Sequence, residues 1–113
     1  MISQVSPSAL AAWFQGVNPH GQPVVLDVRE PGELQAASIR ADGFELVTIP
    51  MGSIPQQLAQ LDASRPIACL CHHGARSMRV AGYLESQGFA HVANISGGIN
   101  AWSLELDPTV ARY

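Results

Sequence analysis

The chain has 113 residues, of which 47% are hydrophobic and 13% are charged, and its formal net charge is -3. This size and composition predict a single compact domain over residues 1–113 with an ordinary hydrophobic core. With only six Lys and Arg residues, the chain is not expected to bind nucleic acid, and no apolar run approaches the length of a membrane span.

The cysteines and the N-terminal residues indicate the compartment. Cys69 and Cys71 are separated by one residue, which is too close for a useful structural disulfide and favours a reducing environment. Residues 1–7 have neither the basic region nor the long apolar run of a secretory signal. We therefore expect a soluble cytoplasmic protein without membrane association.

Strand and helix signals alternate along the first part of the chain. A short strand is expected over residues 2–5. Ser6 as N-cap and Pro7 at the first helical position predict a helix after it, ended by the cluster at residues 18–21. Residues 24–28 are apolar and rich in β-branched side chains, which predicts a strand covered on both faces of a parallel sheet.

The alternation continues to the end of the chain. A short helix is expected over residues 31–37 and a strand over residues 46–49. Ser53 and Gln56 resemble a capping box, and apolar residues recur at helical spacing up to Leu61, which predicts an amphipathic α-helix. A strand is predicted at residues 67–71, followed by a helix from Ser77 to Gln87 that is capped by Ser77 and ended by Gly88. The last predicted elements are a strand at residues 92–95, a turn at Gly97–Gly98 and a final helix carrying Ile99, Trp102 and Leu106.

Repeated strand–helix units of this length predict an α/β fold, with a mostly parallel central sheet, helices on both faces and right-handed connections. In open sheets of this kind, ligands bind beyond the carboxyl ends of the strands. Three such ends carry polar or glycine-rich loops: residues 27–29, the loop after Cys71, and residues 96–98. We expect these loops to face one crevice.

The segment from Cys71 to Ser77, here called the Cys71 loop, joins an expected strand to an expected helix and has the sequence Cys-His-His-Gly-Ala-Arg-Ser. A loop in this position directs backbone N–H groups inward, and the helix dipole adds partial positive charge. These donors and the charge of Arg76 would stabilise a thiolate at Cys71. Gly74 permits the backbone conformation that a tight anion site needs. We therefore predict that Cys71 is a nucleophile that reacts near neutral pH.

The neighbours of Cys71 have alternative interpretations. His72 and His73 are expected to line the mouth of the site and to add positive potential when protonated, not to bind a metal. Cys69 lies within the apolar strand and is interpreted as a core residue, not a resolving thiol. Arg76 is expected either to hold an anionic donor or to orient the loop through backbone carbonyls, in preference to a surface role.

Asp27 and Arg29 have two interpretations that the sequence leaves open. They form either a structural ion pair that braces neighbouring loops or a direct contact to substrate.

Three segments together resemble the signatures of single-domain rhodaneses, a family of sulfurtransferases. They are Asp27-Val28-Arg29 with Glu33, the C-x-x-G-x-R-S pattern of residues 71–77, and Gly97-Gly98-Ile99-Asn100-Ala101-Trp102. The resemblance covers nearly the whole chain. The chain departs from the family at Ala37-Ser38-Ile39, where many members have Gly-His-Ile, and in a longer stretch before Ile49-Pro50.

The resemblance implies a chemistry for these residues. Cys71 matches the catalytic cysteine, which takes a sulfane sulfur from a small anionic donor such as thiosulfate, forms a persulfide and passes the outer sulfur to cyanide or a thiol. The acceptor thiol can belong to a protein, and no cofactor is implied. His72, His73, Gly74, Ala75, Arg76 and Ser77 are then the expected substrate-binding residues, and Asp27 and Arg29 the supporting ones.

Two other functions remain open at the level of the sequence. Cysteine phosphatases and arsenate reductases also place a thiolate in a loop ahead of a helix, but with the spacing C-x5-R, whereas Cys71 to Arg76 is C-x4-R and encloses less space. A non-catalytic rhodanese-like module would bind a partner or carry sulfur.

Overall fold

The structure is a computed structural model that describes residues 2–17 and 21–113. The described residues form a five-stranded parallel sheet in the order β1-β5-β4-β2-β3. Its strands are β1 (Ser3–Val5), β2 (Val24–Asp27), β3 (Glu45–Thr48), β4 (Ile67–Leu70) and β5 (Val92–Ile95). The α-helices are α1 (Leu10–Val17), α2 (Pro31–Ala36), α3 (Ala75–Ser86) and α4 (Gly98–Glu105), and the 3-10 helices are η1 (Pro7–Ala9), η3 (Met51–Ser53) and η4 (Leu58–Gln60). The α/β class predicted from the sequence is confirmed.

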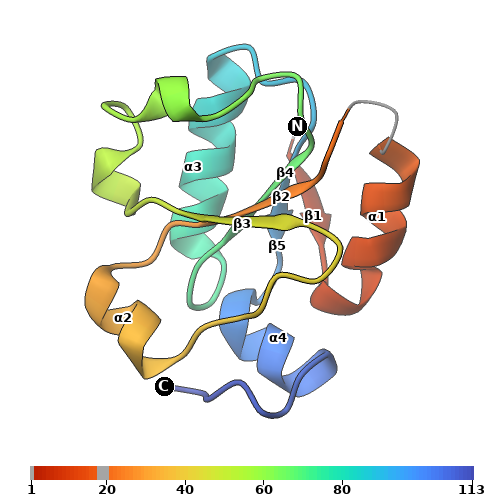
Figure 1. Cartoon of the computed structure of the whole chain (residues 1–113), viewed down its shortest axis with the longest axis vertical. Helices are drawn as coiled ribbons and strands as arrows, with labels where there is room; N and C mark the ends of the chain where they lie inside the picture. Colours follow the sequence, from red (N-terminus) through yellow and green to blue (C-terminus); the bar gives the residue numbers. More distant parts are fainter. Residues whose placement is uncertain (1, 18–20) are drawn as a thin grey trace.

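Helices cover both faces of the sheet, and Figure 1 shows α1 and α3 on opposite sides of it. Leu10 and Phe14 of α1 and Trp102 of α4 belong to one hydrophobic core. Val80 and Leu84 of α3 belong to a second core on the other face. The amphipathic stripe of each helix is therefore buried against its own face of the sheet.

Strand β4 lies in the middle of the sheet and carries the Cys71 loop at its carboxyl end. Leu26 of β2 and Asn94 of β5 lie opposite Cys69 on the two sides. Because side chains alternate along a strand, Leu70 faces the core under α1 and α4, whereas Cys69 and Cys71 face the core under α3. This topology places Cys71 at the edge where parallel sheets bind ligands.

The prediction of an amphipathic α-helix after Ser53 is wrong. The chain there forms the short 3-10 helices η3 and η4, with Gln57 between them outside helical geometry. Ile54 still has helical backbone angles, but Pro55 after it has no N–H to donate, and Gln57 leaves the helical region, so a continuous helix is not sustained. Ile54 is nevertheless buried, and Leu58 and Leu61 pack against the core under α3. The apolar spacing thus predicted which side chains pack against the core, but it did not predict the backbone conformation.

The starts of two helices can be compared with the prediction. Ser6 is the N-cap of η1 and Pro7 its first residue, as predicted, although the Ser6 side chain makes no capping hydrogen bond. Helix α3 begins at Ala75, so the prediction that Ser77 is its N-cap is wrong: Gly74 holds that position in the left-handed region, at φ 111°. Gly88 follows α3 with φ 91°, as expected of a residue that ends a helix. Residues 18–20, in the cluster predicted to end the first helix, lie outside the described residues.

Among residues 2–17 and 21–113, no helix combines the length and the apolar character that a membrane-spanning helix requires.

Candidate active site

The thiol of Cys71 lies just beyond β4, in a buried position. The strand ends at Leu70, whose carbonyl accepts a hydrogen bond from the N–H of Val28 at 2.9 Å. Cys71 is 1% exposed. The chain then turns through Gly74 into α3, which brings the start of this twelve-residue helix next to the thiol. The predicted juxtaposition of a thiol and a helix N-terminus is therefore present.

Two donors of the Cys71 loop contact the Cys71 sulfur. The backbone N–H of Gly74 donates to Sγ at 3.0 Å, and the Ser77 hydroxyl lies within donating distance of Sγ at 3.2 Å. Both donors would favour a negatively charged sulfur over a neutral thiol. Ser77 thus contributes through its buried side chain and not as a helix cap.

The Ser77 hydroxyl carries one proton and has a competing acceptor. Its Oγ also lies in hydrogen-bonding contact with Asn94 Oδ1, the shortest of its contacts. The Asn94 amide in turn donates to Gln4 Oε1 at 2.9 Å and to the Gly74 carbonyl at 3.2 Å. This chain of contacts fixes the Asn94 amide, so that Ser77 can donate to Asn94, to the Gly74 carbonyl at 3.3 Å or to the Cys71 sulfur.

The glycines at the start of α4 allow this helix to approach the Cys71 loop. The N–H of Ile99 donates to the Cys71 carbonyl at 2.8 Å, and that of Asn100 donates to the His72 carbonyl at 3.2 Å. A Cβ at position 98 would lie 2.5 Å from the His72 carbonyl oxygen, so only glycine fits. The predicted turn at Gly97–Gly98 therefore has a specific task, which is to brace the backbone of the Cys71 loop.

Asp27 and Arg29 form a buried ion pair at the end of β2. Arg29 Nη2 lies 2.7 Å from Asp27 Oδ2, and the two side chains are 0% and 1% exposed. Arg29 Nη1 donates to the Ala37 carbonyl at 2.9 Å and to the Glu33 carbonyl at 3.2 Å, which ties β2 to the end of α2. Of the two interpretations left open by the sequence, the geometry supports a structural brace.

Arg76 points toward Glu33 of α2. Its two terminal nitrogens donate to the two carboxylate oxygens of Glu33 at 2.6 and 2.7 Å. The Arg76 hydrogen bonds hold the pKa of the Glu33 carboxyl well below its usual range. The pKa of Arg76 is raised, chiefly by its hydrogen bonds to Glu33.

His72 and His73 form a stacked column with Tyr113. The ring centroids of His72 and His73 are 3.8 Å apart, and those of His72 and Tyr113 are 3.9 Å apart. The Tyr113 hydroxyl donates to Glu33 Oε2 at 2.7 Å. Within the part of the chain that the structure describes, no three His, Cys, Asp or Glu side chains gather as a metal site would require.

Cys69 lies two residues before Cys71 on the same face of the sheet. It is completely buried, and burial raises the pKa of its thiol. Both cysteines are free thiols. A fully buried thiol with a raised pKa is a poor nucleophile, which agrees with the interpretation of Cys69 as a core residue.

The structure adds residues to the site that the sequence did not assign to it. Asn94 carried a signal, since it is a polar residue inside an otherwise apolar strand and is 2% exposed. Glu33 belongs to a quoted signature, but nothing in its local pattern indicated Arg76 as its partner. Tyr113 lies in a tail without any local signal, and only the folded chain brings it to His72.

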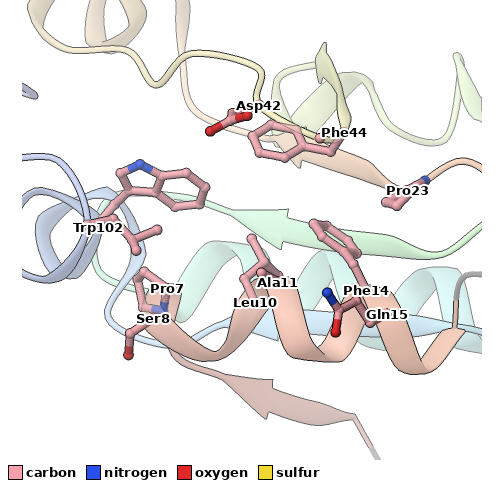
Figure 2. A pocket seen from close by; sticks show the side chains of 12 residues that line it. Pro7, Ser8, Leu10, Ala11, Phe14, Gln15, Pro23, Asp42, Phe44 and Trp102 are labelled. Atoms are coloured by element: carbon pink, nitrogen blue, oxygen red, sulfur yellow. The ribbon is translucent and has the colours of Figure 1, made fainter.

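One cavity lies away from Cys71. Its volume is about 460 Å³, and Figure 2 shows the rings of Phe14, Phe44 and Trp102 around it with Leu10. These four side chains belong to the core under α1 and α4, on the opposite face of the sheet from the Cys71 side chain. No residue of the Cys71 loop lines this cavity.

Comparison with known proteins agrees with this geometry. Residues 6–105 match the family model of the rhodanese-like domain. A putative sulfurtransferase of Bacillus subtilis, YtwF, is 35% identical over 95% of this chain and 96% of its own length. The crystal structure of a rhodanese-related protein from Thermoplasma volcanium superposes with a TM-score of 0.76, at 27% identity over 98% of this chain and 99% of that one.

Other relatives are longer than this chain. A chloroplastic rhodanese-like/PpiC domain-containing protein of Arabidopsis thaliana is 41% identical over 79% of this chain, which spans 30% of that protein. A putative sulfur carrier protein of Bacillus subtilis, YrkF, is 32% identical over 89% of this chain and 52% of its own length.

Proposed function

Because the chain belongs to the rhodanese-like domain family, we propose that it is a sulfurtransferase that carries sulfur as a persulfide on Cys71. The supporting observation is the position of the Cys71 sulfur at the end of the central strand, with the Gly74 N–H and the Ser77 hydroxyl beside it. Relatives named as sulfurtransferases that are 33–35% identical to this chain support the same class of reaction.

The proposed reaction has two displacements on sulfur. The Cys71 thiolate attacks the sulfane sulfur of thiosulfate; a bond from Sγ to that sulfur forms, the sulfur–sulfur bond of thiosulfate breaks, and sulfite leaves with the electron pair. Cyanide or a thiolate then attacks the outer sulfur of the persulfide, and the electron pair of the broken bond returns to Sγ. The thiolate is regenerated, so no external oxidant or reductant is needed.

The Cys71 loop is suited to hold negative charge through both steps. The Gly74 N–H is fixed by the backbone, and the start of α3 adds the positive end of a helix dipole. We propose that residues 72–77 form the binding site of the donor, while Asp27 and Arg29 keep the neighbouring loops in place. The spacing of Cys71 and Arg76 favours sulfur transfer over the phosphatase alternative, since C-x4-R leaves less room for a phosphoryl group than C-x5-R does.

Mass spectrometry after exposure of the protein to thiosulfate tests this proposal. We expect the mass of one sulfur atom to be added on Cys71 and to be removed by cyanide with release of thiocyanate. If Cys71 gains no sulfur from thiosulfate or from a small-molecule persulfide, while the protein remains folded, the proposed function is wrong.

A second candidate is a sulfur-carrying module, since the relative YrkF is named a putative sulfur carrier protein. Such a module would accept sulfur on Cys71 but pass it slowly to cyanide or small thiols. Single-turnover measurement of each half-reaction separates the two candidates, because only an enzyme returns Cys71 to the free thiol rapidly without a protein acceptor.

Arg76 offers a further test of donor binding. Replacing Arg76 with Ala should raise the KM for thiosulfate several-fold, because the donor loses a cation near the thiol. Arg76→Lys should raise the KM less, because lysine keeps the charge but lacks the planar guanidinium. Glu33→Gln is the matched variant, since it removes the carboxylate that now occupies Arg76 and should lower the KM. Steady-state kinetics in which all three variants match the wild type would leave Arg76 with a structural role only.

A further inference from the structure

Tyr113 contacts the Cys71 loop with its ring and the residues beside that loop with its hydroxyl. The ring stacks on His72, the residue after Cys71, with an angle of 12° between the ring planes. The hydroxyl accepts a hydrogen bond from Arg29 Nη1 at 3.2 Å and donates one to Glu33 Oε2 at 2.7 Å. One side chain thus joins the buried Asp27–Arg29 pair, the Glu33–Arg76 pair and the histidines beside the thiol.

The tail that carries Tyr113 is held in place before it reaches the site. Val110 is 6% exposed and belongs to the core under α1 and α4, and its carbonyl accepts a hydrogen bond from the Ser103 hydroxyl at 2.6 Å. Figure 1 shows the C-terminal residue next to α2, the helix that carries Glu33. The segment 110–113 therefore acts as a strap, anchored at Val110 and ending on the Cys71 loop.

The strap ends beside a thiol that solvent hardly reaches. Cys71 is 1% exposed, so a donor cannot reach its sulfur without some displacement of the surrounding groups. His72 Nε2 is buried and has no hydrogen-bond partner among the described residues, although its ring lies between Tyr113 and His73. A buried polar atom without a partner costs free energy, which entry of a polar ligand would recover. Tyr113 itself is 39% exposed, so part of this residue faces solvent.

We propose that Tyr113 is a specificity-determining residue that covers the Cys71 loop and selects donors and acceptors by size. Small sulfur species pass with little movement of the strap, whereas a bulky substrate must first displace the Tyr113 ring from His72. This inference rests on the proposed function only in naming the substrates; the covering of the thiol can be measured without any sulfur transfer.

Alkylation with two maleimides that have the same reactive group but differ in size tests whether Tyr113 covers Cys71. Rates for N-ethylmaleimide and N-(1-pyrenyl)maleimide are measured at Cys71 by mass spectrometry and normalised to the rates of free N-acetylcysteine. In the wild type we expect strong discrimination against the pyrenyl reagent. Tyr113→Ala should raise the alkylation rate of the pyrenyl reagent by about tenfold and that of the ethyl reagent by less than about threefold, because the stacking of Tyr113 on His72 is lost.

Two further variants separate covering from general stability. Tyr113→Phe keeps the ring on His72 but loses both hydroxyl contacts, so it should retain the size discrimination to within about threefold. Tyr83→Ala is the control, since this second tyrosine lies in α3 and packs against the core under that helix. It should leave the ratio of the two rates unchanged. A merely structural role of Tyr113 would speed both reagents equally.

Sulfur donors give the functional readout. In Tyr113→Ala, the ratio of kcat/KM for glutathione persulfide to kcat/KM for thiosulfate should rise by about tenfold. Two results would overturn the proposal. In one, wild-type Cys71 reacts with the pyrenyl reagent as readily as a free thiol does. In the other, Tyr113→Ala leaves the ratio of the two alkylation rates unchanged, whether or not that variant is stable. If the wild type transfers no sulfur but shows the expected alkylation pattern, the proposed function is wrong, whereas the covering of Cys71 by Tyr113 stands.

Discussion

Replacement of Cys71 with Ser is expected to reduce thiosulfate-dependent sulfur transfer by on the order of a thousandfold or more, because the reaction loses the atom that carries the sulfur. Serine keeps the side-chain shape, so the Gly74 and Ser77 donors retain an acceptor and the fold should be preserved. Thiocyanate formation from thiosulfate and cyanide measures the loss, and mass spectrometry should show no added sulfur at position 71.

Cys69→Ala is the matched control for this experiment. Cys69 lies in β4, two residues before Cys71, and faces the same core, but it is completely buried and its thiol has a raised pKa. We expect this variant to keep sulfur transfer within about threefold of the wild type, at some cost in stability from the small cavity it creates. Equal loss of activity in the two folded variants would show that position 71 is not the unique sulfur carrier.

The central part of the fold could be predicted because its signals are local. Residues 24–28 and 67–71 are short apolar runs, and strands buried on both faces need such runs irrespective of their partners. The Cys71 loop could be located for the same reason, since a cysteine, a glycine and an arginine at fixed spacing lie between a strand and a helix. Local patterns also determined the parallel arrangement of the sheet.

The partners within the site could not be predicted, because they depend on contacts between distant segments. Arg76 meets Glu33 across 43 residues and Tyr113 meets Glu33 across 80 residues. The sequence therefore predicts that Arg76 holds an anion or orients the loop, whereas in the folded chain its guanidinium is already paired with Glu33. Ser77 showed a related limit: its residue type is typical of an N-cap, but burial next to Asn94 gives its hydroxyl different partners.

The second large effect is expected on stability, at the buried pair of Asp27 and Arg29. Asp27→Asn keeps the size of the side chain but leaves the Arg29 charge buried without a counter-charge. Removal of one partner from a buried ion pair costs about 3–5 kcal/mol in the free energy of unfolding. We expect a loss toward the lower end of this range, about 3 kcal/mol, because Arg29 keeps its hydrogen bonds to the Ala37 and Glu33 carbonyls.

Glu45→Gln provides the comparison, since it makes the same carboxylate-to-amide change in an ion pair with an arginine at the surface. Glu45 Oε1 lies 2.8 Å from Arg65 Nη2, but its side chain is 50% exposed, whereas that of Asp27 is 1% exposed. A surface pair of this kind contributes at most about 1 kcal/mol, so urea denaturation should show a much smaller change for Glu45→Gln. If the two variants lose similar free energy of unfolding, burial does not set the strength of the Asp27–Arg29 brace, and the position of α2 against the Cys71 loop must depend on other contacts.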